Sequence, residues 1–236
     1  GSFNTTLSQD KFGLGYKHAV GVVVLIDSYG PFSRAKLKAA YAYHLPVSKK
    51  TLLSMGMFFG IEQISFDASE LEAINFNDDA INNSQRATIF PEFTPGVMLQ
   101  SKKWFAGATL QQTIGGPKKV IGTDETRFSR HATLLGGLNL NLTDDWSFIP
   151  STMLKFTRGT PWAIDVNAMF DYKNKFSAGI GYRNTDAAMA LVSFNVFDYF
   201  KLGYAFDYTV SKIRFGSSNT HEVTLSINPV VLLLTK

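Results

Sequence analysis

The chain has 236 residues, a formal net charge of +4 and no cysteine, which excludes a disulfide framework and a thiolate metal site. Aromatic residues make up 14% of it and 19 residues are glycine, a combination that favours strands and tight turns over helices. No apolar run approaches the roughly 20 residues of a transmembrane helix. The basic residues do not form the stripe typical of RNA-binding strands, so no nucleic-acid partner is expected.

Along the chain, large apolar residues alternate with small or polar residues in segments of roughly ten residues. A period of two is typical of β-strands. The residues from Phe12 to Val231 predict about twelve strands, and residues 3–8 predict one more before them. The alternation is clearest at 36–45, 131–142, 146–156, 162–172, 176–183 and 200–208.

The connections between these segments are of two kinds, which alternate strictly along the chain. Short turns are predicted at 47–50, 102–103, 143–145, 173–174 and 198–199, and longer loops at 28–34, 67–92, 115–126, 158–160, 184–186 and 210–219. In an up-and-down meander, all the short turns then lie at one end, as in outer-membrane barrels. The prediction is an all-β, transmembrane antiparallel up-and-down β-barrel, a single domain over residues 1–236. Since bacterial barrels have an even number of strands, the thirteen visible strands predict an intact barrel of about fourteen that lacks its first strand here.

The alternative is a soluble β-sandwich or β-solenoid. A soluble sandwich would bury its aromatic residues and expose lysine and glutamate on the opposite face. Here the positions opposite the aromatic residues are mostly Gly, Ala, Ser, Thr and Asn, which suit a confined interior better than open water. The pattern therefore favours the barrel.

Scattered charges on the small-residue face predict a polar network in the barrel lumen, because an enclosed charge is costly unless it is paired. The candidates are Asp165, Asn167, Arg183, Lys201, Asp207 and Glu222. Asp207 and Glu222 could be paired carboxylates on neighbouring strands, as a glycosidase requires, but no substrate cleft is implied. A lumenal salt network of these acids with Lys201, Arg183 or Arg214 is favoured instead. The four histidines lack metal-ligand spacing, and no nucleophile or phosphate-binding motif occurs. We expect no enzyme activity, cofactor or metal.

Two further sets of residues have predicted roles. Trp104, Trp146 and Trp162 stand at or near strand starts, where the interfacial aromatic girdle of a barrel lies. The loop 67–92 is the longest and has a net charge of −5, with six acids and one base. The loop 210–219 lies at the same predicted end, so opposite charges could fold the long loop over the mouth or present a joint surface to an exported domain. The partner-binding candidates are Glu70, Glu72, Asp78, Asp79, Lys212 and Arg214.

The order of several short motifs resembles the PorP/SprF-like family of type IX secretion. The most specific part is the C-terminal pattern formed by Tyr204, Asp207, Ser211, Gly216, His221, Glu222 and Leu225. Upstream, residues 27–60 resemble the family's "D-x-x-G-P … Y-A-Y-x-L-P … L-S-x-G-x-x-x-G" run. Further matches are "PEFTPGVML", "KKWFAGATL", "WSFIPSTMLK", "DVNAMF" and "GIGYR". The resemblance covers about positions 20–228, although the family's N-terminal strand and a terminal aromatic residue are not visible.

The resemblance implies a non-enzymatic barrel in the bacterial outer membrane that helps to export or anchor a large secreted protein such as an adhesin of gliding motility. Its implied partners are the lipid bilayer with lipopolysaccharide, the C-terminal domain of the secreted substrate, and periplasmic ring components. The alternative is an uptake barrel for hydrophobic molecules, like the long-chain fatty acid transporters. That function requires an apolar lumen, for which the candidates are Met55, Met57, Phe59, Ile61, Met169, Met189 and Leu191.

Overall fold

The computed structural model describes residues 2–8, 17–67, 87–111, 130–184, 186–197, 200–210 and 219–227. All regular structure in these ranges is β-strand, and no helix in them is long and apolar enough to cross a membrane. The strands are β1 (Ser2–Ser8), β2 (Lys17–Tyr29), β3 (Phe32–Ser48), β4 (Thr51–Phe66), β5 (Ala87–Ser101), β6 (Trp104–Gln111), β7 (His131–Leu138), β8 (Leu140–Asn141), β9 (Trp146–Thr157), β10 (Ala163–Tyr172), β11 (Phe176–Arg183), β12 (Ala187–Phe197), β13 (Phe200–Thr209) and β14 (Thr220–Ile227).

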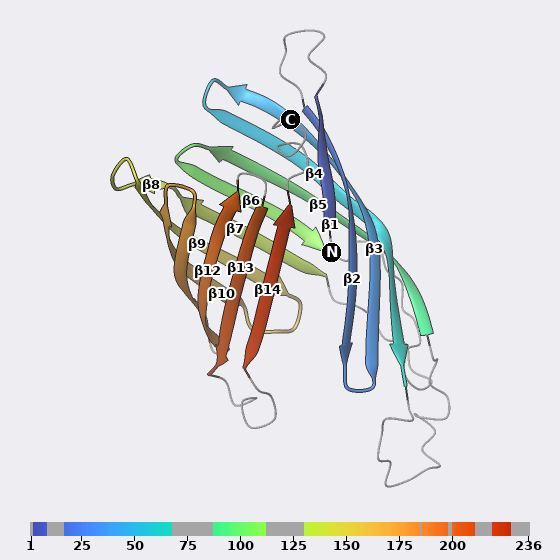
Figure 1. Ribbon diagram of the computed structural model, residues 1–236. Coiled ribbons are helices and arrows are strands. Elements are labelled where there is room, and N and C mark those ends of the chain that lie inside the picture. Colours follow the sequence, from blue (N-terminus) through green and yellow to red (C-terminus); the bar gives the residue numbers. More distant parts are fainter. Residues whose placement is uncertain are drawn as a thin grey trace, which may run out of the picture. The chain divides into compact units, whose positions relative to one another are not determined.

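The strands follow one another in chain order in a single sheet, as an up-and-down meander requires (Figure 1). Thirteen of them form the path β1-β2-β3-β4-β5-β6-β7-β9-β10-β11-β12-β13-β14. The two-residue β8 continues β7 after Asn139 and pairs with β9. The predicted all-β class, antiparallel up-and-down order and number of visible strands are confirmed.

Two predicted loop boundaries are wrong. The connection predicted at 28–34 is a two-residue turn at Gly30 and Pro31, with Gly30 at a φ of 51°. The polar residues around this turn are paired strand residues, for example Asp27 with Arg34. The loop predicted at 67–92 ends earlier, because β5 begins at Ala87 and continues through Pro91 and Glu92. Polar strand ends and an internal proline both resemble loop sequence, and this explains the two errors.

The structure divides into two compact units. The first unit comprises Gly1–Leu99, Gly107–Ala132 and Thr157–Thr160, and the second comprises Gln100–Ala106, Thr133–Phe156 and Pro161–Lys236. Each unit is described by itself below. The expectation of a single domain stays a prediction.

In the first unit, the strand β3 shows how the two faces differ. Leu37 and Tyr41 are 51% and 41% exposed, whereas the side chains of Lys36 and Lys38 on the other face are each 17% exposed. Glu62, on the adjacent strand β4, is 3% exposed. Near it, the side chains of Ile64 and Phe90 form a small buried cluster against Phe32. We call the face of this unit that carries Leu37 its apolar face, and the face that carries Glu62 its polar face.

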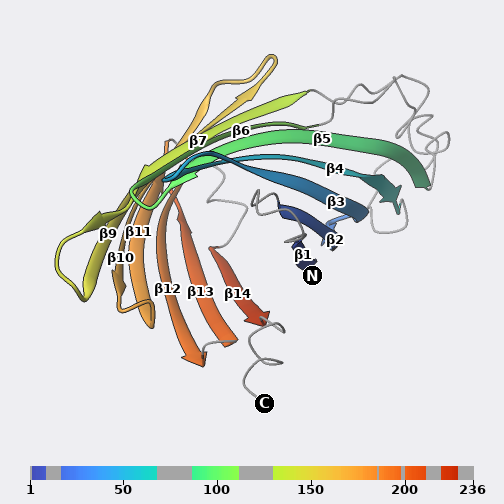
Figure 2. The same cartoon turned by 90° about the horizontal axis from the view of Figure 1, so that it is seen from above.

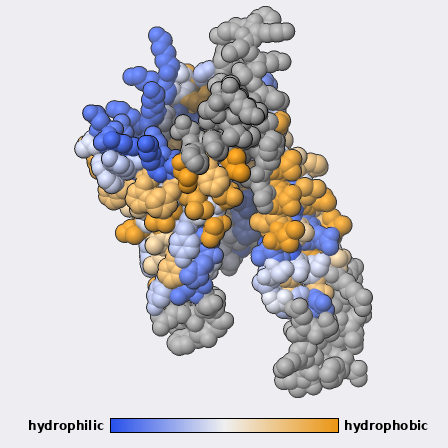
Figure 3. Space-filling model, in the orientation of Figure 1, coloured by the Kyte–Doolittle hydropathy of each residue, from blue (hydrophilic) through white to orange (hydrophobic). Residues whose placement is uncertain are grey.

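In the second unit, strands β9 to β14 lie side by side in chain order (Figure 2). Asp165 is 2% exposed, whereas Val166 beside it is 53% exposed and Ile180 on the next strand is 69% exposed. We call the face with Val166 the apolar face of this unit and the face with Asp165 its polar face. Soluble proteins bury the apolar side and expose the charged side, so both units reverse the usual pattern. Figure 3 shows hydrophobic residues gathered between hydrophilic stretches.

Candidate functional site

A cluster of ion pairs lies on the polar face of the second unit, around the nearly buried Asp165. The Nε atom of Arg183 lies 2.9 Å from Oδ1 of Asp165, and the Nζ atom of Lys155 lies 3.0 Å from Oδ2. The Nη1 atom of Arg183 also forms an ion pair with Oδ2 of Asp186, at 3.2 Å. The register accounts for this cluster, because Asp165 pairs with Arg183 on β11 and with Met153 on β9, two residues from Lys155.

The register also places all six predicted polar candidates on this same face. Asn167 pairs with Gly181, Gly181 with Met189, and Met189 with Asp207. On β13 and β14, Lys201 pairs with Ser226 and Ala205 with Glu222. Paired residues of antiparallel strands share a face.

Only Asp165 and Arg183 of these six candidates form an ion pair with each other. In the described ranges, Lys201 and Asp207 have no ion pair, and Glu222 accepts a hydrogen bond from Thr224 at 3.4 Å. Asp165 and Asp186 occupy the guanidinium of Arg183, which forms no ion pair with Asp207 or Glu222 among the described residues. The wider polar network that would include these two acids stays a prediction. Lys155 and Asp186 are members of the cluster that the sequence did not indicate.

A second ionic cluster, on the polar face of the first unit, was not predicted. Its two carboxylates, Glu62 on β4 and Glu92 on β5, are 3% and 4% exposed. The bases follow one another along β3 at every second position. Arg34 Nε lies 2.9 Å and Lys36 Nζ 3.1 Å from Glu62, and Lys38 Nζ lies 2.6 Å from Glu92. Lys36 also lies 3.8 Å from Glu92 and so links the two pairs.

The charge of this second cluster is nearly balanced, with three bases against two acids. The residual charge of +1 is carried by side chains that keep some contact with solvent, since Lys36 and Lys38 are each 17% exposed. The hydroxyl of Thr94 also donates to Glu92, at 3.4 Å. Three strands are thereby joined through side chains as well as through the backbone. The sequence does show bases at every second position, at Arg34, Lys36 and Lys38. Arg34 and Glu92 were assigned to the predicted loops 28–34 and 67–92, so their place in the cluster could not be inferred.

The three predicted girdle tryptophans lie in the second unit, and all three are exposed. Trp104 begins β6, Trp146 begins β9, and Trp162 immediately precedes β10. Trp146 packs against Tyr172 with ring centroids 4.8 Å apart, and Trp162 packs edge-on against Phe156 at 5.1 Å. Trp146 and Phe156 stand ten residues apart on one strand, which is about 33 Å of strand and about 23 Å of height at a tilt of about 45°. This is close to the apolar band of about 25 Å in outer-membrane barrels.

Hydrogen bonds join neighbouring turns at the short-turn end of the second unit. Lys173 in the β10–β11 turn donates its backbone N–H to the carbonyl of Asp145 at 2.8 Å, and its ammonium lies 3.1 Å from the Asp145 carboxylate. The hydrogen bond to Asp145 raises the pKa of Lys173. Asn139, where β7 is interrupted, likewise donates its backbone N–H to the carbonyl of Lys103 at 2.8 Å.

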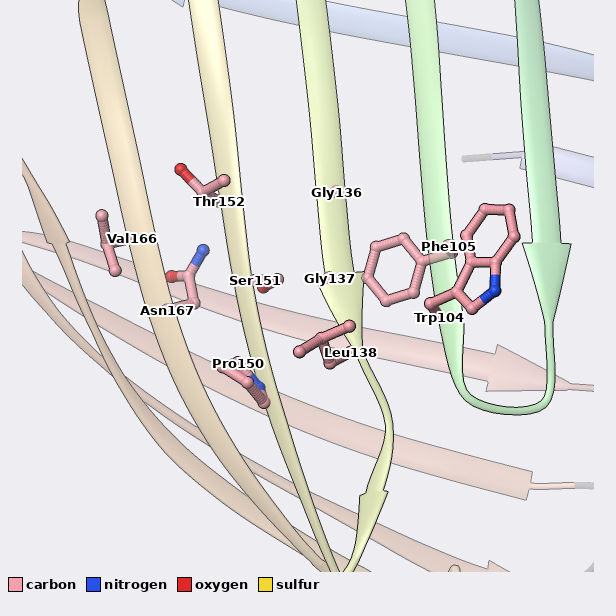
Figure 4. Close-up of a pocket in the computed structure, with 10 residues that line it drawn as sticks. All are labelled: Trp104, Phe105, Gly136, Gly137, Leu138, Pro150, Ser151, Thr152, Val166 and Asn167. Carbon is pink, nitrogen blue, oxygen red and sulfur yellow. The ribbon is translucent and has the colours of Figure 1, made fainter.

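A shallow hollow of about 600 Å³ lies over strands β6, β7, β9 and β10 of the second unit (Figure 4). Trp104, Gly136, Leu138, Pro150, Thr152 and Val166 contribute to its lining. Thr152 and Val166 pair across β9 and β10. Six of its ten lining residues, Val166 among them, stand at even positions, which carry the exposed apolar side chains on these strands, so the hollow opens mainly on the apolar face.

The remaining predictions concern the partner-binding loops and the possibility of a metal site. Glu70, Glu72, Asp78, Asp79, Lys212 and Arg214 lie outside the described residues. Within the described ranges, no group of three or more histidine, aspartate or glutamate side chains could hold a metal ion. The two ionic clusters described above consist of acids and bases paired with each other, an arrangement that links neighbouring strands.

Comparison with known families identifies the group to which the chain is related. Residues 2–227 match the family described as "Type IX secretion system membrane protein PorP/SprF". The chain belongs to the PorP/SprF family. This confirms the resemblance inferred from the motifs and extends it to the first described strand. PorP/SprF proteins are membrane components of the type IX secretion system, and the chain is therefore assigned to a membrane. A search of curated proteins found no match.

Among solved structures, this PorP/SprF protein is similar to the toluene transporter TbuX of Ralstonia pickettii. The TM-score is 0.58 and the sequence identity is 10%, over 96% of this chain and 79% of the transporter. At this identity the likeness concerns the fold alone. It agrees with the predicted class of a membrane β-barrel.

Proposed function

We propose that the chain is a non-enzymatic outer-membrane component of type IX secretion that assists the export or surface anchoring of a large secreted protein such as an adhesin. The observation that carries this proposal is the family match over residues 2–227, which include every residue that the structure describes. The site geometry supports a structural role, because the nearly buried acids Asp165, Glu62 and Glu92 are each held by bases on neighbouring strands.

The arrangement of the two faces supports insertion in a lipid bilayer. Each unit exposes large apolar side chains on one face and encloses its ionic cluster on the other. In a closed barrel of about fourteen strands the polar faces would line the lumen and the apolar faces would meet lipid. The partners on the apolar side are then membrane lipids, including lipopolysaccharide in the outer leaflet.

The secreted substrate is proposed to bind at the loop end, through residues 70–86 and 211–218. The first segment carries Glu70, Glu72, Asp78 and Asp79, and the second carries Lys212 and Arg214. Surface charge pairs are weak, about 0–1 kcal/mol each, so these charges would orient a partner more than hold it. The short turns at the opposite end would face periplasmic components of the secretion machinery.

The experiment deletes residues 70–86 and measures how much of the secreted protein's C-terminal domain co-purifies from detergent-solubilised membranes. We expect the deletion variant to reach the membrane at normal levels and to recover less of the partner. Undiminished recovery would place partner binding elsewhere, most simply on the lysine-rich short turns. Recovery of no secreted protein even by the intact chain would contradict the proposal.

A hydrophobic uptake function is supported less well by the arrangement of the faces. The expected apolar lining by Met55, Met57, Phe59 and Ile61 is wrong, because the register pairs these residues with Tyr43, Tyr41, Ala39 and Leu37 on the apolar face. They are 43–60% exposed there. Met169, Met189 and Leu191 do lie on the polar face of the second unit, but among charged and small residues.

A further inference from the structure

We infer that the hollow on the apolar face of the second unit, together with the Lys102–Lys103 turn, binds one anionic phospholipid. The acyl chain would lie in the hollow and the phosphate would lie at the two lysines. The inference rests on the membrane location of the chain and is independent of its role in secretion.

The hollow exists because Gly136 lacks a side chain where its neighbours carry large ones. A Cβ placed at Gly136 would meet only the carbonyl oxygen of Phe105, at 3.6 Å, and would otherwise point into open space. Leu138 and Val166 stand at its sides and are 47% and 53% exposed. A volume of about 600 Å³ falls within the range of small-molecule sites, roughly 300–1,000 Å³. Hydrocarbon is the chemistry that such a lining accepts.

Trp104 connects the hollow to the membrane interface. Its ring lines the hollow at the first residue of β6, immediately after the turn formed by Lys102 and Lys103. Tryptophan prefers the headgroup level of a bilayer, because its ring has an apolar body and a polar N–H group. An acyl chain beside this ring therefore places its headgroup next to the turn.

The two lysines supply the positive charge that would favour a lipid with an anionic headgroup over an uncharged hydrocarbon. Lys102 and Lys103 are exposed, and neither forms an ion pair in the described part of the chain. Lys173, at the neighbouring β10–β11 turn, is held by Asp145. The position of the turn is set by the backbone, since Ser101 Oγ accepts the N–H groups of Lys103 and Trp104 at 3.2 and 3.3 Å. Two free ammonium groups on an ordered turn complement an anionic headgroup.

The test is native mass spectrometry of the purified chain after exchange into a mixture of phosphatidylglycerol and phosphatidylcholine with identical acyl chains. The intact chain is expected to retain one phosphatidylglycerol in preference to phosphatidylcholine. The variant Lys102→Gln/Lys103→Gln is expected to lose that preference, by about fivefold for each lysine. Gly136→Leu fills the hollow and is expected to lower the retention of both lipids.

The matched control is Lys49→Gln/Lys50→Gln, which removes the lysine pair of the β3–β4 turn. It is expected to leave the preference unchanged. Equal retention of both lipids by the intact chain would overturn the inference. An equal loss of preference in the control would also overturn it, because the effect would then reflect overall charge. Unaltered lipid retention in Gly136→Leu would overturn it as well.

A second measurement leaves the hollow intact. In a chain whose only tryptophan is Trp104, with Trp146 and Trp162 replaced by phenylalanine, phosphatidylglycerol brominated in its acyl chains is expected to quench the fluorescence at lower mole fraction than brominated phosphatidylcholine. Identical quenching curves would contradict a specific site. Both measurements use the isolated chain, so a negative result would not bear on the proposed role in secretion. Conversely, failure of the secreted partner to co-purify would not bear on the lipid site.

Discussion

Asp165 and Arg183 face each other across β10 and β11, with the guanidinium Nε 2.9 Å from the carboxylate Oδ1. The carboxylate belongs to a residue that is 2% exposed, and Val166 next to it on the apolar face is 53% exposed. A charge is thus enclosed on one face of the sheet, beside a large apolar side chain that is exposed on the other. This relationship defines the solvent that each face is expected to meet.

Removal of the Asp165 charge is expected to destabilise the second unit. Asp165→Asn keeps the shape of the side chain but leaves Arg183 and Lys155 without their shared partner. Breaking a buried pair costs about 3–5 kcal/mol. Because the two bases are 28% and 39% exposed, we expect a smaller loss of about 2–3 kcal/mol in the free energy of unfolding. Urea titration of the chain in lipid vesicles measures it.

The control for this variant is Asp145→Asn, which breaks the exposed pair with Lys173. Both side chains of that pair are nearly half-exposed, so its unfolding curve is expected to match that of the parent chain. Equal losses in the two variants would show that burial of Asp165 does not strengthen its ion pairs.

The ionic cluster of the first unit is expected to behave as one coupled group. Glu92→Gln leaves Lys38 without its partner at 2.6 Å, and Lys38→Gln leaves the carboxylate of Glu92 with the longer contacts to Lys36 and to the hydroxyl of Thr94. The double variant should cost less than the sum of the two single variants, with a coupling of about 0.5–3 kcal/mol. A double-mutant cycle in the same unfolding assay measures the coupling. Strict additivity would mean that the contact between the two side chains adds nothing to stability.

Much of the fold could be predicted from the sequence, because strand alternation is a local property. The thirteen strands, the short turns and the common face of Asp165 and Asp207 all follow from a period of two. The cross-strand ion pairs could not be predicted, since the contact of Arg34 with Glu62 depends on a register that the local pattern does not contain. The inward assignment of Met55, Met57, Phe59 and Ile61 ran against the local pattern, because large apolar residues stand at every odd position of 53–61 while the even positions are mostly serine and glycine. The register against Leu37 and Tyr41, with Glu62 on the opposite face, places the odd positions on the apolar face.

The exposed tryptophans are expected to report two membrane interfaces. In chains that keep only Trp146 or only Trp162, lipids brominated near the headgroup should quench fluorescence more strongly than lipids brominated near the chain end, because the two residues stand at opposite ends of their strands. Stronger quenching by the deep bromines at either position would place that tryptophan in the bilayer interior and would contradict the girdle assignment.

The cost of replacing an exposed apolar residue by arginine shows whether that face meets lipid or water. Ile180 is 69% exposed in the middle of β11. In water, Ile180→Arg would be nearly neutral, whereas near the middle of a bilayer it should cost about 2–4 kcal/mol. The comparison variant is Ala205→Arg, which places a guanidinium opposite Glu222 on the polar face. It is expected to be milder, and folded yield in lipid vesicles ranks the two variants.

The most direct measurement of the central claim uses the absence of cysteine from the chain. Residues 201–208 of β13 are replaced by cysteine one at a time and spin-labelled in lipid vesicles, and collision with oxygen and with a water-soluble nickel complex is measured at each position. We predict a period of two in which positions 202, 204, 206 and 208 are reached by oxygen and shielded from nickel, since they share the apolar face. Nickel access at these even positions, or no alternation along the strand, would contradict a sheet whose apolar face meets lipid.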